Sequence, residues 1–128
     1  MKIKGRVIVP GSAEGEVFFT DHPITFYGGV DMKTGKIVQS DHPRKGESIT
    51  GKILVFPYGV GSTVGSYVIY GMKKYGTAPK AIVLQRVDTV VAAGVLLADI
   101  PTVDQIDIEK LRNTKKVRVI DGIVEVLE

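Results

Sequence analysis

Hydrophobic and polar positions alternate in the first part of the chain, and many of the apolar positions hold β-branched residues. Two segments follow this period of two, 2–10 and 15–19, with a small-residue turn between them. A third short alternating segment covers 34–38. Because successive side chains of a strand point to opposite faces of a sheet, we predict three strands in this region.

The middle of the chain contains two segments that are apolar at nearly every position, 52–57 and 80–85. This pattern is typical of strands that are covered on both faces of a sheet. A run of alanine, valine and leucine at 89–98 has the length of a helix packed against such a sheet. We therefore predict a strand–helix–strand unit followed by a second helix.

The first of these helices is predicted between the two apolar strands, where the apolar period changes to three and four residues. Ser62 stands at a natural N-cap position and Gly76 at a natural C-cap position. Two tyrosines, Tyr67 and Tyr70, are expected at the border of the buried face. That face is predicted to consist of Val64, Val68, Met72 and Tyr75.

The end of the chain predicts a β-hairpin. Residues 117–120 and 123–126 alternate, and Asp121-Gly122 supplies a two-residue turn between them. One helical turn is expected at 108–111. Together these elements indicate a mixed α/β fold with a single domain over residues 1–128, without repeats or linkers.

Composition limits the chemistry that this chain can supply. It has 128 residues, no cysteine and two histidines, so we expect neither an iron–sulfur cluster nor a metal site within it. No apolar run approaches the roughly 18 residues of a membrane span and no secretory signal is visible, which predicts a cytoplasmic protein. The net charge is +3, but acidic and basic residues are interspersed, so we expect no nucleic-acid interface.

The candidate site lies in the glycine-rich segment 57–66, where a buried strand ends and a helix begins. The first N–H groups of a helix lack intrahelical acceptors, and glycine lets the backbone approach a ligand closely, so the segment is suited to an anion. Gly61 and Thr63 are therefore candidate anion-binding residues. The glycine spacing matches neither the Walker A loop nor the dinucleotide fingerprint, which argues against a nucleotide.

Ser62 has two interpretations. In the first, its hydroxyl only caps the helix. In the second, it is a catalytic hydroxyl, activated by His22 or His42, or acting as a base itself where the helix start and a cation from a partner stabilise its alkoxide. The residue pattern leaves both open.

The tripeptide Asp-His-Pro occurs twice, at 21–23 and 41–43. Asp followed by X-Pro is a frequent start of a turn, which is the favoured interpretation. Metal ligation, or a histidine base oriented by its carboxylate, is the alternative. Arg44 and Lys45 follow the second copy and are candidates for binding a phosphate-like anion, although a short charged loop is usually solvated.

An ordered series of motifs extends from Val7 to Val103. It includes Gly28-Gly29-Val30-Asp31, Gly51–Pro57, Gly61-Ser62, Gly65-Ser66, Ala78–Ile82 and Ile100–Val103. This series resembles the small, swivel-domain subunit of the aconitase X family. The resemblance implies a swivelling β/β/α fold and a two-subunit hydro-lyase, in which a large subunit holds a [4Fe-4S] cluster and this chain closes over it.

The resemblance also implies a reaction, the dehydration of a phosphorylated hydroxy acid, (R)-5-phosphomevalonate, to trans-anhydromevalonate 5-phosphate. The cluster iron would act as a Lewis acid on the tertiary hydroxyl, and Ser62, at the position of the family's catalytic serine, would accept a proton from the neighbouring methylene. Some family members have arginine just before the Gly-Ser pair, where this chain has Val60. Another cation would then be needed, from the partner or from Arg6, Arg44 or Arg86.

Three alternative functions stay open. The chain could serve an aconitase X-type enzyme for another hydroxy acid, such as a hydroxyproline-related one. It could be a non-catalytic anion-binding swivel module. It could also carry phosphate in a phosphotransferase system, but both histidines precede proline, which counts against a mobile phosphate-carrying loop.

Overall fold

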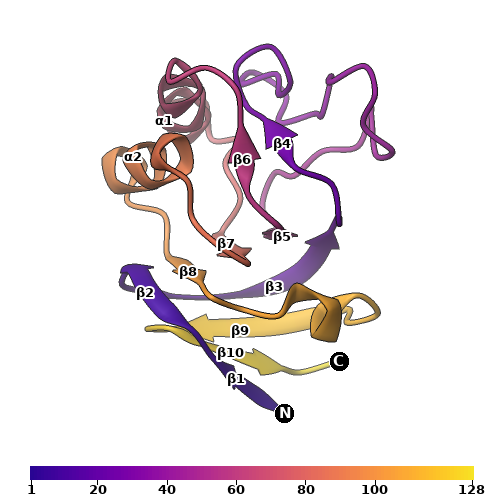
Figure 1. Ribbon diagram of the computed structural model, residues 1–128, viewed down its shortest axis with the longest axis vertical. Coiled ribbons are helices and arrows are strands. Elements are labelled where there is room, and N and C mark those ends of the chain that lie inside the picture. Colours follow the sequence, from indigo (N-terminus) through magenta and orange to yellow (C-terminus); the bar gives the residue numbers. More distant parts are fainter.

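One eight-stranded sheet runs through the protein, in the order β1-β10-β9-β3-β5-β7-β8-β2. The computed structural model describes residues 1–128 (Figure 1). The strands of this sheet are β1 (Lys2–Lys4), β2 (Arg6–Val9), β3 (Ser12–Phe19), β5 (Ile53–Phe56), β7 (Ala81–Leu84), β8 (Thr102–Asp104), β9 (Lys116–Ile120) and β10 (Ile123–Val126). Two further strands, β4 (Ile24–Thr25) and β6 (Gly59–Val60), pair in parallel as a separate ribbon. The helices are α1 (Gly65–Tyr75), α2 (Thr89–Ala98) and the 3-10 helix η1 (Ile108–Leu111).

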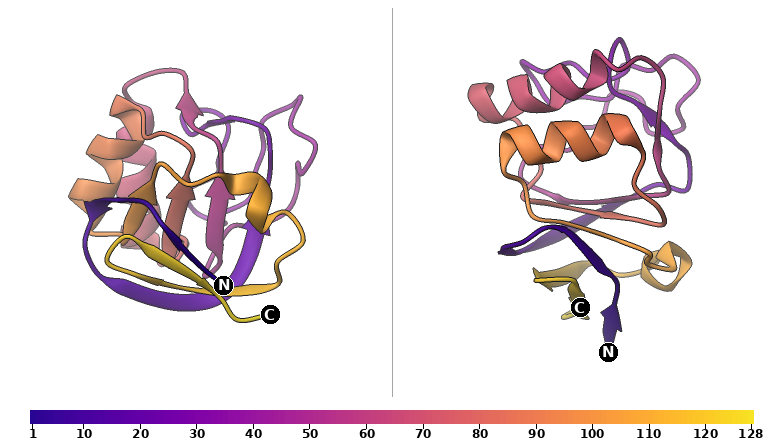
Figure 2. Two further views of the ribbon diagram at one scale, coloured as in Figure 1. Left: turned by 60° about the horizontal axis from the view of Figure 1, so that its bottom comes forward. Right: turned by 60° about the vertical axis from the view of Figure 1, so that its left-hand side comes forward.

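Strand β3 joins two halves of the sheet. Its residues Ser12–Glu16 pair antiparallel with β9, whereas Val17–Phe19 pair in parallel with β5. The antiparallel half therefore folds beneath the parallel half, and the two helices cover the opposite face. Figure 2 (right) shows these three layers from the side, with the helices above, the parallel strands in the middle and β1, β9 and β10 below. The mixed α/β fold is as predicted from the sequence.

The parallel strands are buried on both faces, as their continuous apolar sequence predicted. On β5, Leu54 and Phe56 belong to the core beneath the helices. Ile53 and Val55 belong to a second core, shared with η1 and the β9–β10 hairpin. All four side chains are fully removed from solvent. Because apolar burial is the main favourable contribution to folding, these two cores hold the three layers together.

Two of the predicted strands differ from the structure. Residues 2–10 form two strands instead of one, because the chain breaks at Gly5, whose N–H donates to the carbonyl of Gly122 at 2.7 Å. A side chain at Gly5 would also collide with the backbone of Asp104. Residues 34–38 form no strand at all; only two isolated bridges occur there, Val30–Ile37 and Lys36–Ser48.

Helix α1 begins two residues later than predicted, at Gly65, with Val64 instead of Ser62 in the N-cap position and no side-chain cap. It ends as predicted at Gly76, which has φ 77°. The predicted buried face was partly wrong, because Val64 lies in the preceding turn and Tyr75 at the exposed end of the helix. Tyr67 is exposed as well. The residues of α1 that are buried are Gly65, Ser66, Val68, Ile69 and Met72.

Helix α2 and η1 have the predicted bounds, and β9 and β10 form the hairpin around Asp121-Gly122. Strand β3 begins at Ser12, within the predicted small-residue turn, and the short strands β4, β6 and β8 were not predicted. No helix of the protein combines the length and the apolar character needed to cross a lipid bilayer.

Candidate functional site

The segments that follow the parallel strands lie together at one edge of the sheet, which we name the carboxyl edge. Strands β3, β5, β7 and β8 are parallel neighbours, so the loops after Phe19, Phe56, Leu84 and Asp104 meet there. This edge is where open α/β sheets commonly bind ligands. In this protein it holds the glycine-rich loop, both histidines and Arg86.

Ser62 lies in the turn between β6 and α1, and it is exposed. Its Oγ accepts a hydrogen bond from the N–H of Val64 at 3.2 Å, and its carbonyl accepts one from the N–H of Gly65 at 2.9 Å. The hydroxyl therefore does bind a backbone N–H, as a capping residue would. The bond lies in the turn before α1 instead of in its first turn.

Three successive backbone N–H groups of this loop, those of Gly61, Ser62 and Thr63, find no acceptor within the chain. Gly61 has φ 97°, and a side chain there would approach Cγ2 of Thr25 to 2.8 Å, so this position requires glycine. Successive free N–H groups beside a helix start attract anions. The loop is thus built as the sequence suggested, and anion binding by Gly61 and Thr63 stays a prediction.

Strand β6, which leads into the serine loop, is held from two sides. It pairs with β4, and the N–H of Gly59 donates to Oδ1 of Asp88 at 2.8 Å. Asp88 is also the N-cap of α2, where its Oδ2 accepts from the N–H of Val91 at 3.1 Å. Asp88 was not predicted from the sequence, although an Asp directly before an apolar helical run is a recognisable N-cap signal.

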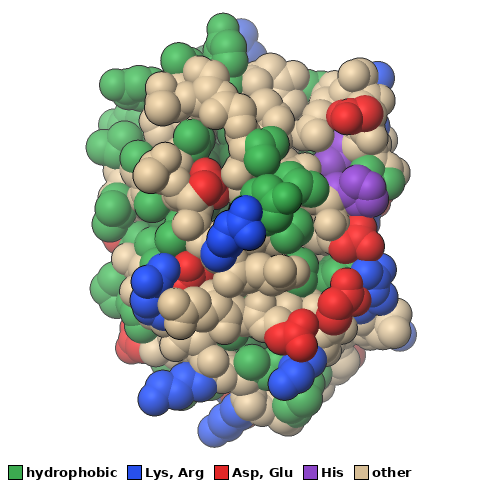
Figure 3. All heavy atoms as spheres, viewed as in Figure 1, with side chains coloured by type: hydrophobic (Ala, Val, Ile, Leu, Met, Phe, Trp, Pro, Cys, Tyr) green, Lys and Arg blue, Asp and Glu red, His purple; other side chains and the backbone are tan.

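The two Asp-His-Pro tripeptides meet at the carboxyl edge. The rings of His22 and His42 lie 5.9 Å apart, edge to face. Histidine side chains, purple in Figure 3, are grouped together on the face shown there. His22 is exposed and its Nδ1 lies 2.8 Å from Oδ1 of Asp21. His42 is buried; its Nδ1 accepts from the N–H of Arg44 at 3.0 Å and its Nε2 lies 3.4 Å from Oγ1 of Thr20. Burial, with His22 as a second cause, lowers the pKa of His42.

These histidines belong to turns. The N–H of His42 donates to the carbonyl of Gln39, and the carbonyl of His42 accepts from the N–H of Lys45. No cluster of three histidine, aspartate or glutamate side chains assembles in a way that would hold a metal ion. A cavity of about 480 Å³ opens beside both rings and extends to the strand before the serine loop, because Thr25 and Val60 also line it.

Arg44 is engaged within the chain. Its guanidinium donates to both carboxylate oxygens of Glu47, at 2.6 and 3.0 Å, and to the carbonyl of Phe19 at 2.7 Å. It also lies 3.7 Å over the ring of Phe18. This ion pair lowers the pKa of Glu47. Arg44 therefore fastens its loop to β3, which removes the main support for an anion-binding role, whereas Lys45 is exposed and makes no ion pair.

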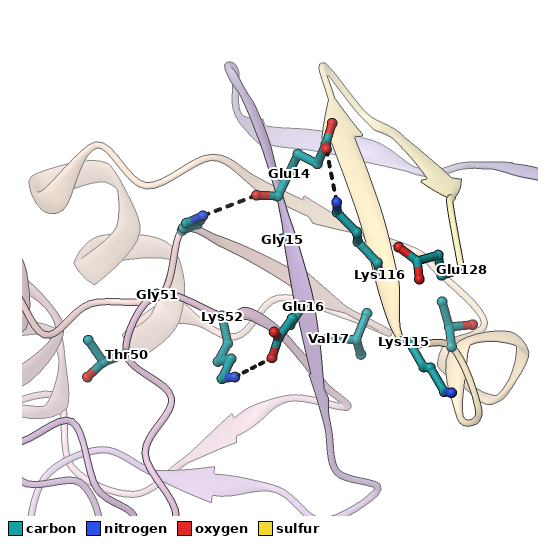
Figure 4. Close-up of a pocket in the computed structure, with 12 residues that line it drawn as sticks. Glu14, Gly15, Glu16, Val17, Thr50, Gly51, Lys52, Lys115, Lys116 and Glu128 are labelled. Carbon is teal, nitrogen blue, oxygen red and sulfur yellow. Dashed lines mark hydrogen bonds and ion pairs between the residues drawn. The ribbon is translucent and has the colours of Figure 1, made fainter.

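A larger cavity, of about 920 Å³, lies at the opposite edge of the sheet (Figure 4). Its four lysines face three glutamates: Lys52 pairs with Glu16 at 2.6 Å, and Lys116 lies 3.5 Å from Glu14. Lys80 donates to the backbone carbonyl of Glu14. Because its charges are balanced locally and it is remote from the glycine-rich loop, we do not assign the site to this cavity.

Comparison with known proteins gives the family. The aconitase X swivel domain model matches residues 2–126. The chain belongs to this family. As an aconitase X swivel domain, it is similar over its length to the phosphomevalonate dehydratase small subunits of Thermococcus kodakarensis (54% identical, covering 100% of this chain and 98% of the relative) and Pyrococcus furiosus (55% identical, 95% and 90%). It is 45% identical to that of Methanosarcina acetivorans (100% and 92%).

Solved structures agree with the family assignment. The crystal structure of Thermococcus kodakaraensis aconitase X in its holo form matches with a TM-score of 0.97 at 53% identity, covering 100% of this chain and 99% of that one. The solution structure of a UPF0107 protein matches with a TM-score of 0.88 at 44% identity, covering 100% of both chains. The swivel-domain fold that the resemblance implied is therefore confirmed.

Proposed function

We propose that this aconitase X swivel domain is the small subunit of a two-subunit hydro-lyase that dehydrates (R)-5-phosphomevalonate to trans-anhydromevalonate 5-phosphate. The proposal is supported by the names of its relatives, which are phosphomevalonate dehydratase small subunits 54% and 55% identical to it. One observation carries its catalytic part. Ser62 is exposed at the carboxyl edge, with an N–H on its Oγ and three free N–H groups in its own loop.

Ser62 is proposed as the base that takes a proton from the methylene next to the tertiary hydroxyl. A serine hydroxyl becomes basic only where its alkoxide is stabilised, by hydrogen-bond donors and by positive dipoles. The N–H of Val64, 3.2 Å from Oγ, and the nearby start of α1 supply both. In the step, the serine alkoxide takes the proton, the C–H electron pair forms the double bond, and the hydroxyl leaves with the C–O electrons as hydroxide. The proton on Ser62 then combines with the hydroxide to give water, which restores the alkoxide.

The free N–H groups of Gly61 and Thr63 are proposed to bind an oxygen of the substrate. The carboxylate of the substrate is bonded directly to the reacting methylene, so a carboxylate bound by this loop brings the methylene towards Ser62. Holding the reacting atoms in this way contributes to rate by orientation alone. The exposure of the loop is also consistent with a site completed by a second chain.

The [4Fe-4S] cluster of the proposed enzyme belongs to the large subunit. This chain has no cysteine, and no three of its histidine, aspartate and glutamate side chains are grouped as metal ligands. Its own residues therefore do not fit a cluster, and the proposal gives this chain the base and part of the substrate site only. The carboxyl edge is the surface proposed to face the large subunit.

The test is reconstitution. The chain is co-expressed with the cluster-bearing large subunit of the same source, purified without oxygen, and incubated with (R)-5-phosphomevalonate; loss of water is followed by mass spectrometry. We expect product from the complex and none from either chain alone. A hydroxyproline-related acid is tested in parallel. Turnover of the hydroxyproline-related acid without turnover of phosphomevalonate would overturn the substrate assignment. Failure of the two chains to associate would overturn the subunit assignment.

A further inference from the structure

Arg86 differs from every other arginine of the protein, because it has no anionic partner. The remaining arginines all pair with carboxylates: Arg6 with Asp104, Arg44 with Glu47, Arg112 with Asp21 and Glu109, and Arg118 with Glu14 and Glu125. The guanidinium of Arg86 instead lies 4.2 Å over the ring of Tyr58. It is exposed and forms no ion pair with a carboxylate of the chain.

The backbone around Arg86 is fixed, although its side chain is free of hydrogen bonds. The N–H groups of Gln85 and Arg86 donate to the carbonyl of Pro57, at 3.1 and 3.3 Å. The next N–H, of Val87, donates to Oδ2 of Asp104 at 2.8 Å, and Asp104 is itself buried and held by Arg6. The loop that carries Arg86 is thus fastened to the ends of β5 and β8.

The contact with Tyr58 holds the guanidinium of Arg86 over the ring and leaves its donors available. A cation over an aromatic ring is attracted by the ring face without using an N–H donor, and the Arg86 side chain makes no hydrogen bond within the chain. Two parallel N–H groups of this kind match the two oxygens of a carboxylate or phosphate. Arg86 is therefore preorganised for an oxyanion.

Arg86 is linked to Ser62 through Tyr58, the residue that its guanidinium contacts. Tyr58 directly precedes β6, and Ser62 is four residues after Tyr58, so the Cα atoms of Tyr58 and Ser62 are at most about 14 Å apart. The loop of Arg86 and strand β6 are further joined through Asp88, which accepts from the N–H of Gly59. Both are segments of the carboxyl edge, and the edge has no other unpaired arginine.

We propose that Arg86 binds an oxyanion of the substrate, its carboxylate or its phosphate, beside the Ser62 loop. Arg6 and Arg44, which the sequence also offered for this role, are committed to Asp104 and Glu47. This inference rests on the proposed function and names the part of the substrate site that this chain contributes by side chain.

The test uses the reconstituted two-chain enzyme with Arg86→Gln and Arg86→Lys. Lys2→Gln serves as the control, because it removes the same charge from an exposed residue of β1, in the opposite layer. We expect Arg86→Gln to raise KM at least tenfold with kcat changed only a few-fold, Arg86→Lys to restore part of the loss, and Lys2→Gln to match the wild type. Since the Arg86 side chain makes no hydrogen bond, neither variant is expected to unfold.

Inhibition of phosphomevalonate turnover by inorganic phosphate and by unphosphorylated mevalonate distinguishes which oxyanion Arg86 holds. If it holds the phosphate, Arg86→Gln weakens inhibition by inorganic phosphate and leaves inhibition by mevalonate unchanged. If it holds the carboxylate, inhibition by mevalonate weakens by the same factor as the affinity for phosphomevalonate. Either result supports the inference.

Two results for Arg86→Gln overturn the inference. The first is an unchanged KM. The second is a weaker affinity between the subunits together with a normal KM at saturating large subunit, which would show that Arg86 contacts the large subunit instead of the substrate. An active wild-type complex with either result overturns this inference alone. An inactive wild-type complex overturns the proposed function and this inference with it.

Discussion

The carboxylate of Asp88 connects Gly59 to the first turn of α2. One oxygen accepts the N–H of Gly59 at 2.8 Å, and the other accepts the N–H of Val91 at 3.1 Å. A side chain on Gly59 would lie 3.0 Å from both oxygens, so the strand passes as close to this carboxylate as its backbone allows. Because Ser62 follows β6 after Gly61 alone, Asp88 sets the position of the serine loop without being part of it.

Replacement of Asp88 is expected to reduce both stability and turnover. Asp88→Ala removes a helix cap and leaves the N–H of Gly59 without an acceptor, which is expected to lower the free energy of unfolding by about 1–2 kcal/mol. In the reconstituted enzyme, we expect kcat to fall more than about tenfold with KM within a few-fold, because the base moves while the rest of the site remains. Asp88→Asn keeps one acceptor oxygen, so its stability and kcat should lie between those of the wild type and Asp88→Ala. A folded Asp88→Ala enzyme with normal kcat would show that Asp88 is only structural.

Ser62→Ala separates the two interpretations of this serine. If Ser62 is the base, the variant loses about two to four orders of magnitude in kcat. If it only stabilises its turn, kcat changes little and the loss is at most about 1 kcal/mol of stability. Ser12→Ala is the matched control, since Ser12 is exposed on β3 and its hydroxyl makes no hydrogen bond. Single-turnover rates with anaerobic complex, together with urea unfolding of each chain, measure both quantities.

His42 is expected to make stability depend on pH. The side chain is buried, and burial is the main cause that lowers its pKa from the ordinary value of about 6.5. The folded protein therefore binds this proton more weakly than the unfolded chain does. The contribution of neutral His42 to the free energy of unfolding is complete above about pH 6.5, and it is lost as the pH falls towards the pKa of His42 in the folded protein.

The Tm should accordingly decline as pH is lowered from about 7 to about 5, and His42→Asn should flatten this decline. Asparagine is chosen because its Oδ1 can replace the ring Nδ1 as acceptor for the N–H of Arg44. Arginine lowers the pKa of several carboxylates, as Arg44 does for Glu47. Protonation of these carboxylates destabilises the fold only at lower pH, below about 4.5. An equal slope in wild type and His42→Asn would contradict this assignment.

Local patterns in the sequence were sufficient where burial follows the period of one element. Strand β5 is apolar at each position and is buried on both faces, so its prediction held. The segment 34–38 also alternates, but it is a loop that pairs with its neighbours only through two isolated bridges, and Ile37 of this loop is fully buried. Alternation indicates which side chains are buried. A loop held by isolated bridges can bury alternate side chains as a strand does, so the pattern does not distinguish the two.

The candidate site divides in the same way. The glycine-rich loop and Ser62 were predictable because strand, turn and helix follow one another directly along the chain. The meeting of His22 with His42, and the carboxylate partners of Arg6 and Arg44, depend on which strands are neighbours in the sheet. No periodic pattern encodes that order, so the special position of Arg86 emerges only in the folded protein.

Two glycines inside helices offer a direct test of how α1 and α2 pack. A side chain on Gly94 of α2 would meet Ile69 of α1, 2.7 Å from Cδ1 and 2.8 Å from Cβ, and Ile69 is buried. A side chain on Gly71 of α1 would meet only Met32, at the sulfur near the end of a flexible and partly exposed side chain. The first neighbour is fixed by the core, whereas the second can move aside.

The same substitution is therefore expected to have opposite effects at the two sites. Gly71→Ala should raise the free energy of unfolding by up to about 1 kcal/mol, because alanine favours the helix. Gly94→Ala gains the same preference, but overpacking against Ile69 costs about 1–3 kcal/mol, so we expect a net loss. Urea unfolding of the two variants beside the wild type measures the difference. If Gly94→Ala were as stable as Gly71→Ala, the two helices would cross at a greater distance than the structure gives them.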